Sequence, residues 1–143
     1  MRHLPISGGI AFLLPLLTGC PNTVTVEVVN ETDLPVEPNI RYSAAANDLN
    51  AILTGLFGGT ELSSGTVLAH TTRQFSFACD EIGVVFSNSA RQTLIGVTVA
   101  EASDSGILQR GNEYDCGDTV EFHFLGAGSG FAVETRVNGS IVN

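Results

Sequence analysis

The residues with the most distinctive chemistry in this chain are its three cysteines, Cys20, Cys79 and Cys116. A cysteine can bind a metal ion, react in redox chemistry, form a disulfide or carry a lipid. Zinc sites usually combine C-x-x-C pairs, or place cysteines near histidines at short spacing. Neither Cys79 nor Cys116 has such a neighbour. The pattern therefore argues against a zinc site, and no cofactor is expected.

Cys20 follows an apolar segment at the start of the chain. Met1–His3 is a short basic start, and Leu4–Leu17 is a largely apolar run without an acidic residue, which is the layout of a secretory signal. The run is too short to span a bilayer core of about 30 Å. Its end, Leu17-Thr18-Gly19-Cys20, resembles the lipobox of bacterial lipoproteins, in which an aliphatic residue and two small residues precede a cysteine.

The lipobox resemblance implies that residues 1–19 are a lipoprotein signal peptide and that Cys20 becomes a lipidated N-terminus. Residues 20–22 would be a very short linker, and residues 23–143 a single domain. Because three extended residues reach only about 10 Å, this domain would lie close to the membrane. The expected location is the cell envelope, on a membrane outside the cytoplasm, at a periplasmic or surface face. The alternatives are a plain signal peptide ending near a cysteine, and a buried helix.

Once Cys20 is assigned to lipid, Cys79 and Cys116 remain as an even pair. Disulfides persist in exported proteins, so we expect a Cys79–Cys116 disulfide.

Carboxylates gather around this pair in the sequence. They are Asp80 and Glu81 after Cys79, and Glu113, Asp115 and Asp118 around Cys116. A cluster of such hard oxygen ligands suits Ca²⁺, although no EF-hand spacing is present. The expected arrangement is a solvated acidic rim whose Asp residues serve turns, and weak calcium binding by the rim is the alternative.

Catalytic chemistry has less support in the sequence. The mature part contains two histidines, His70 and His123, and a Ser-His-Asp site would need one of them beside Ser76, Ser87 or Asp118. No G-x-S-x-G elbow is present to expose a nucleophile. His123 lies beside Glu121 on the polar side of an expected strand, where solvated histidines are common. We expect that the protein is not an enzyme.

The charge of the chain disfavours anionic partners. It has 15 acidic residues and six basic ones, all Arg, and removal of Arg2 with the leader leaves five, a formal charge of −10. Binding to nucleic acid or to anionic lipid headgroups requires basic residues. Gly126–Gly130 lacks the Lys and the following helix of a phosphate loop, so a hairpin turn is expected there. Attachment to the membrane would therefore depend on the N-terminal lipid.

Alternating apolar and polar residues predict several half-buried strands. The expected strands are Thr23–Val29, Val36–Tyr42, Thr66–His70, Gln74–Cys79, Ile82–Phe86, Thr93–Ala100, Ile107–Gln109, Thr119–Phe124 and Phe131–Val137. Thr93–Ala100 is apolar on both faces, which favours a central strand, and Pro38 favours an edge position for its strand. The spacing of turns predicts a mainly β fold, an antiparallel, immunoglobulin-like β-sandwich of about seven to nine short strands.

One amphipathic helix is expected near residues 48–57. Its apolar stripe has helical spacing and consists of Leu49, Ile52, Leu53, Leu56 and Phe57. The stripe is expected to face the core, and a partner-binding helix is the alternative.

The mature chain also resembles small envelope lipoproteins of no known activity. The resemblance rests on the run from Thr23-Val24-Thr25-Val26 through Asn30, Thr32 and Pro35-Val36, and on Cys116-Gly117-Asp118. Taken together, these observations predict a membrane-anchored, non-catalytic envelope module that is structural or binds a protein or glycan partner, and does not bind nucleic acid. Exposed aromatic residues on one face would favour a glycan or protein partner, and a ring of carboxylates would favour an ion.

Overall fold

A computed structural model describes residues 22–44, 60–103 and 105–142. The described residues contain ten strands and one 3₁₀ turn: β1 Thr23–Asn30, β2 Val36–Ser43, β3 Thr60–Glu61, β4 Thr71–Ala78, β5 Val84–Leu94, β6 Val97–Ala102, β7 Leu108–Gln109, β8 Thr119–Leu125, η1 Gly128–Gly130, β9 Ala132–Val137 and β10 Ser140–Ile141. No helix within these ranges is long and apolar enough to cross a membrane. The helix expected near residues 48–57 lies outside the described residues.

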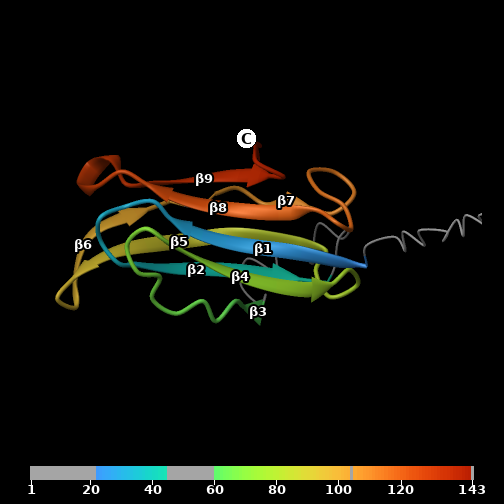
Figure 1. Ribbon diagram of the computed structural model, residues 1–143, viewed down its shortest axis with the longest axis horizontal. Helices are drawn as coiled ribbons and strands as arrows, with labels where there is room; N and C mark the ends of the chain where they lie inside the picture. The colour runs from blue at the N-terminus through green and yellow to red at the C-terminus, as the bar shows by residue number, and fades with distance from the viewer. Residues whose placement is uncertain (1–21, 45–59, 104, 143) are drawn as a thin grey trace, which may run out of the picture.

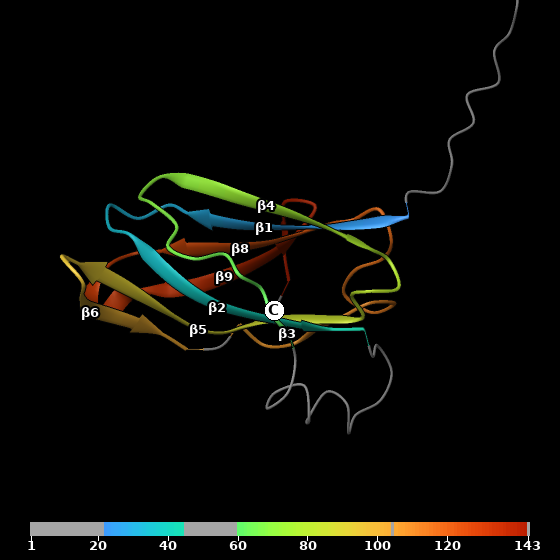
Figure 2. The same cartoon turned by 90° about the horizontal axis from the view of Figure 1, so that it is seen from below.

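The strands form two five-stranded sheets that pack face to face (Figures 1 and 2). One sheet has the order β10-β9-β8-β1-β4, and the other has the order β3-β2-β5-β6, with β7 also paired to β5. The mainly β sandwich predicted from the alternation is therefore confirmed.

The more detailed prediction, an antiparallel and immunoglobulin-like sandwich, is wrong in two respects. β1 pairs antiparallel with β4 but parallel with β8, in the register Thr25 to Thr119 through Asn30 to Phe124. In addition, β1 and β2 lie in different sheets, whereas the first two strands of an immunoglobulin domain share one. Alternation with a period of two determines which face of a strand is buried, but it does not determine which strands are its neighbours.

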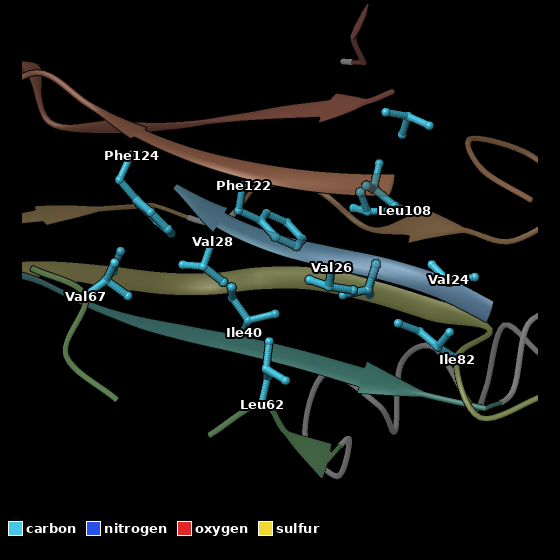
Figure 3. Packing of buried hydrophobic residues seen from close by; sticks show 14 of the residues in the cluster. Val24, Val26, Val28, Ile40, Leu62, Val67, Ile82, Leu108, Phe122 and Phe124 are labelled. Atoms are coloured by element: carbon cyan, nitrogen blue, oxygen red, sulfur yellow. The ribbon is translucent and has the colours of Figure 1, made fainter. Parts of the chain in front are cut away.

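The core lies between the two sheets and is aliphatic and aromatic. The inward residues of β1, which are Val24, Val26 and Val28, are fully buried, as are Phe122 and Phe124 of the neighbouring β8. Figure 3 shows these side chains pointing toward residues of the opposite sheet. The burial follows the alternation of the sequence, because every second residue of a strand points to the same face.

A buried asparagine holds the corner where the chain crosses from one sheet to the other. Asn30 ends β1 and is 1% exposed. Its amide nitrogen donates to the carbonyl oxygens of Leu34 and Val67, and its amide oxygen accepts from the backbone N–H of Thr32. This side chain satisfies backbone groups that the corner would otherwise leave unpaired.

The sequence predicts a central strand at Thr93–Ala100, but this apolar segment forms a hairpin. β5 ends at Leu94, the turn consists of Ile95 and Gly96, and β6 returns from Val97. β6 is the last strand of its sheet. Consecutive apolar residues predict a strand that is buried on both faces. Here the chain reverses direction at Ile95 and Gly96, and the second half of the apolar segment forms the edge strand β6.

Two smaller predictions also fail. Thr66–His70 contains no strand, only an isolated bridge between Val67 and Val36 followed by a turn. Pro38 lies in a strand that has neighbours on both sides, but β3 pairs only with Arg41 and Tyr42 among the described residues. Pro38 has no backbone N–H to donate, and this is tolerated because the short strand β3 does not extend as far as Pro38.

Gly126 is predicted to be essential to the β8–β9 connection. Its φ is +75°, and a Cβ at this position would clash with the carbonyl oxygen of Gly130. Gly126→Ala should therefore lower the free energy of unfolding by about 2 to 3 kcal/mol in a urea titration. Gly128→Ala is the control, because φ is also positive (+55°) but the added Cβ meets no atom within 4 Å. Equal losses for the two variants would show that the clash is relieved by a small backbone movement.

Candidate functional site

Cys20 lies outside the described residues, but the start of the domain after it is held by hydrogen bonds on both sides. β1 begins at Thr23. The backbone N–H of Cys79 donates to the carbonyl oxygen of Asn22 at 3.0 Å, and that of Gly117 donates to the carbonyl oxygen of Thr23 at 2.8 Å. The chain is therefore held in the sandwich from two residues after Cys20.

The structure joins Cys79 and Cys116 by a disulfide, as the cysteine pattern predicted, with Cα atoms 5.7 Å apart. The bond links the end of β4 to the loop before β8, beside the start of β1. Tyr114 in the same loop is 2% exposed and its hydroxyl donates to the carbonyl oxygen of Ile82. Burial raises the pKa of the Tyr114 phenol far above its ordinary value, so this hydroxyl stays neutral and anchors the loop.

The carboxylates around the disulfide mainly close turns. Glu81 accepts from the backbone N–H of Ala78 at 3.0 Å, and Asp118 accepts from the backbone N–H of Asp115 at 2.7 Å. Asp118 also accepts from the side-chain amide of Asn138. These contacts match the expected rim of turn-forming acids.

A calcium site gains no support from this geometry. The weak candidates for Ca²⁺ ligands in the sequence are Asp80, Glu81, Asp115 and Asp118. Across the described ranges, no group of three His, Cys, Asp or Glu side chains is placed so that it could hold a metal ion.

His70 and His123 contact carboxylates rather than the serines of a catalytic arrangement. Nε2 of His70 lies 2.9 Å from Oδ1 of Asp33, and both side chains are largely exposed. His123 contacts Glu31 through Nδ1 at 2.5 Å and Glu121 through Nε2 at 2.9 Å. The structure therefore does not bring Ser76, Ser87 or Asp118 to either imidazole as a triad would require.

The interpretation of His123 as a solvated histidine is wrong, because its side chain is only 8% exposed. Glu31 follows β1, while His123 and Glu121 belong to β8, so the cluster joins the two strands of the parallel pair. Each nitrogen of the His123 imidazole therefore lies within hydrogen-bond distance of a carboxylate oxygen. The sequence places Glu121 two residues from His123, on the same side of the strand. It gives no sign of the contact with Glu31, which lies 92 residues away in the chain.

The largest anomaly on the surface is the tip of the β5–β6 hairpin. Ile95 is 96% exposed, Val97 is 63% exposed and Leu94 is 50% exposed, and Val99 is also exposed. The exposed large apolar residues of the described part are all aliphatic, the others being Leu68 and Ile141. The part of the chain that the structure describes therefore lacks the exposed aromatic face that would favour a glycan or protein partner.

The turn at this tip uses an unusual residue. Ile95 has a φ of +51° and Gly96 a φ of +75°, the signs required by the two-residue hairpin turn that favours Asn-Gly. The β9–β10 hairpin of the same protein has that pair, with Asn138 at +50° and Gly139 at +78°. A β-branched residue at positive φ costs on the order of 1 to 3 kcal/mol, so Ile95 is a poor choice for folding alone.

Comparison with known proteins gives a structural likeness but no match to a family model or a curated protein. Among solved structures, the chain is similar to the crystal structure of the T6SS lipoprotein TssJ1 from Pseudomonas aeruginosa, with 12% sequence identity and a TM-score of 0.45. The match covers 84% of this chain and 98% of that chain. At this TM-score and identity the likeness assigns neither a family nor a function.

Proposed function

We propose that this protein is a lipid-anchored module of the cell envelope that binds another component and catalyses no reaction. The observation that carries the proposal is the position of the lipobox-like Leu17-Thr18-Gly19-Cys20 relative to the folded domain. β1 begins at Thr23, so only two residues would separate a lipidated Cys20 from the sandwich. Lipid chains contribute about 0.8 kcal/mol per buried CH₂, and more than one chain gives stable anchoring.

The remaining features fit an exported, non-catalytic module. The Cys79–Cys116 disulfide suits an oxidising compartment. The imidazoles contact carboxylates, and the acids around the disulfide close turns. The exposed aliphatic hairpin provides a surface for binding. No observation favours calcium binding as a second function.

Anchoring is tested by substitution of the proposed lipid acceptor. Cys20→Ala should move the protein out of the detergent-soluble membrane fraction, or leave it unprocessed at a higher mass, because the acceptor thiol is lost. Pro21→Ala is the control, since it changes the next residue and leaves the lipobox-like sequence intact. The result is read by membrane fractionation and immunoblotting. Membrane association that persists in Cys20→Ala at the processed mass would contradict the proposal.

A further inference from the structure

The hairpin tip lies at the end of the domain opposite the start of β1. β1 runs from Thr23 to Asn30, a length of about 24 Å at roughly 3.4 Å per residue. Beyond its far end, the backbone N–H of Thr93 donates to the carbonyl oxygen of Pro35, just before the hairpin turn. Figures 1 and 2 place β6 at one end of the sandwich and the start of β1 at the other. In a protein anchored at Cys20, the tip therefore points away from its own membrane.

The edges of the two sheets differ in how they are protected against further pairing. β3 and β10 are two residues long, and β4 carries Arg73, an exposed residue whose guanidinium donates to the carbonyl oxygen of Ser64. Short edge strands and charged side chains on an edge strand both discourage association. β6 has neither device over Val97–Ala100, although it contains a bulge opposite Gln92 and Thr93. The apolar hairpin is therefore the least protected part of the described surface.

We propose that the β5–β6 hairpin docks on a partner protein, which receives Leu94, Ile95, Val97 and Val99 in an apolar pocket bordered by basic residues. This inference rests on the proposed function, because the lipid anchor sets the direction in which the hairpin points. The run from Gln92 to Ala100 has no charged residue, so its burial would leave no charge unpaired. The formal charge of −10 on the mature chain favours a partner with positive charge around that pocket.

Other occupants fit less well. A glycan would be expected to stack on aromatic rings, and the exposed apolar residues here are aliphatic. The membrane that holds the anchor lies at the opposite end of the domain. A second copy paired antiparallel along β6 would have its long axis reversed, which would place the two anchors at opposite ends of the pair, and two acidic copies would repel each other.

The position of Ile95 supports a binding role through the strain at the turn. The β9–β10 hairpin has the favoured pair Asn138-Gly139 at its turn. The β5–β6 hairpin, whose tip is apolar and exposed, has Ile95-Gly96 at the same turn positions. Strained residues that persist in a structure are enriched at binding sites. Selection for the isoleucine side chain would explain its presence at a position where asparagine is conformationally better.

Photocrosslinking in the intact, lipid-anchored protein tests this inference. A benzophenone amino acid is placed at position 95, and at position 141 as the control, because Ile141 is also exposed at a hairpin strand. We expect one defined protein adduct from position 95 and none from position 141, with the crosslink mapped to an apolar pocket that has basic neighbours. Equal labelling at both positions, an adduct with lipid, or an adduct with a second copy would overturn the proposal.

Substitution then tests whether the side chain contributes to binding. Ile95→Asn should weaken binding to the crosslinked partner by about tenfold or more, while the melting temperature stays the same or rises because Asn-Gly suits the turn. Ile95→Gly, which also permits positive φ, should give the same loss, and Ile141→Asn should give none. Unchanged affinity in folded Ile95→Asn and Ile95→Gly would refute docking through this tip.

Membrane fractionation of the same samples separates the two proposals. If the Ile95 variants remain anchored and bind normally, docking at the hairpin fails while the lipid anchor stands. If the wild-type protein is not membrane-bound, the proposed function fails, and the direction assigned to the hairpin fails with it.

Discussion

Replacement of both Cys79 and Cys116 by alanine is expected to lower the free energy of unfolding by about 4 kcal/mol. The two cysteines are 37 residues apart, and the chain-entropy account of a cross-link gives this magnitude for a loop of that size. The bond also lies beside the hydrogen bonds that hold Asn22 and Thr23. The part of the domain next to the proposed anchor should therefore loosen first.

Urea unfolding of the double variant and of the oxidised wild type measures the effect. Hydrogen exchange should be faster at the backbone amides of position 79 and of Gly117, which donate to Asn22 and Thr23 in the wild type. Reduced wild-type protein is the control and should resemble the double variant. A loss of less than about 1 kcal/mol would mean that the folded domain does not depend on the cross-link.

The substitution His123→Asn is expected to lower the free energy of unfolding by about 3 kcal/mol. The shorter side chain cannot reach both Glu31 and Glu121, so at least one of the two contacts of the imidazole is lost. Leaving a buried polar group without its hydrogen-bond partner costs about 1 to 3 kcal/mol, and more for a charged group. The upper part of that range applies because the Glu121 side chain is only 15% exposed.

The matched control is His70→Asn, since His70 contacts Asp33 at a similar distance but on the surface. Asn also tolerates the positive φ of +54° at position 70. Denaturant titration should show a small change for His70→Asn and a large one for His123→Asn. Adding Glu31→Gln to His123→Asn should recover part of the loss. Equal losses of stability for the two histidine variants would show that burial of the His123 hydrogen bonds does not matter.

The alternation of side chains predicted the strands that form the core. Val24, Val26 and Val28 alternate with polar residues, and so do Val120, Phe122 and Phe124, and all six are fully buried. The Cys79–Cys116 pairing could also be predicted from the sequence, because the lipobox-like motif accounts for the third cysteine, Cys20. These predictions depend on local spacing and counting, which the sequence shows directly.

The neighbours of each strand could not be predicted in the same way. The parallel pairing of β1 with β8 joins residues about 94 positions apart, and no local signal reports it. The Glu31–His123 contact depends on that pairing, so the sequence predicts a solvated His123 where the structure buries it. The hairpin at Ile95 was missed because an apolar run predicts burial, and isoleucine is not a turn residue.

The central claim is that Cys20 anchors this domain to an envelope membrane, and intact-mass analysis of the protein extracted from its membrane in detergent tests it most directly. The account predicts a mature chain that begins at Cys20, lacks residues 1–19 and carries the added mass of two or three acyl groups at that residue. A chain without acyl groups, recovered from the soluble fraction, would contradict it.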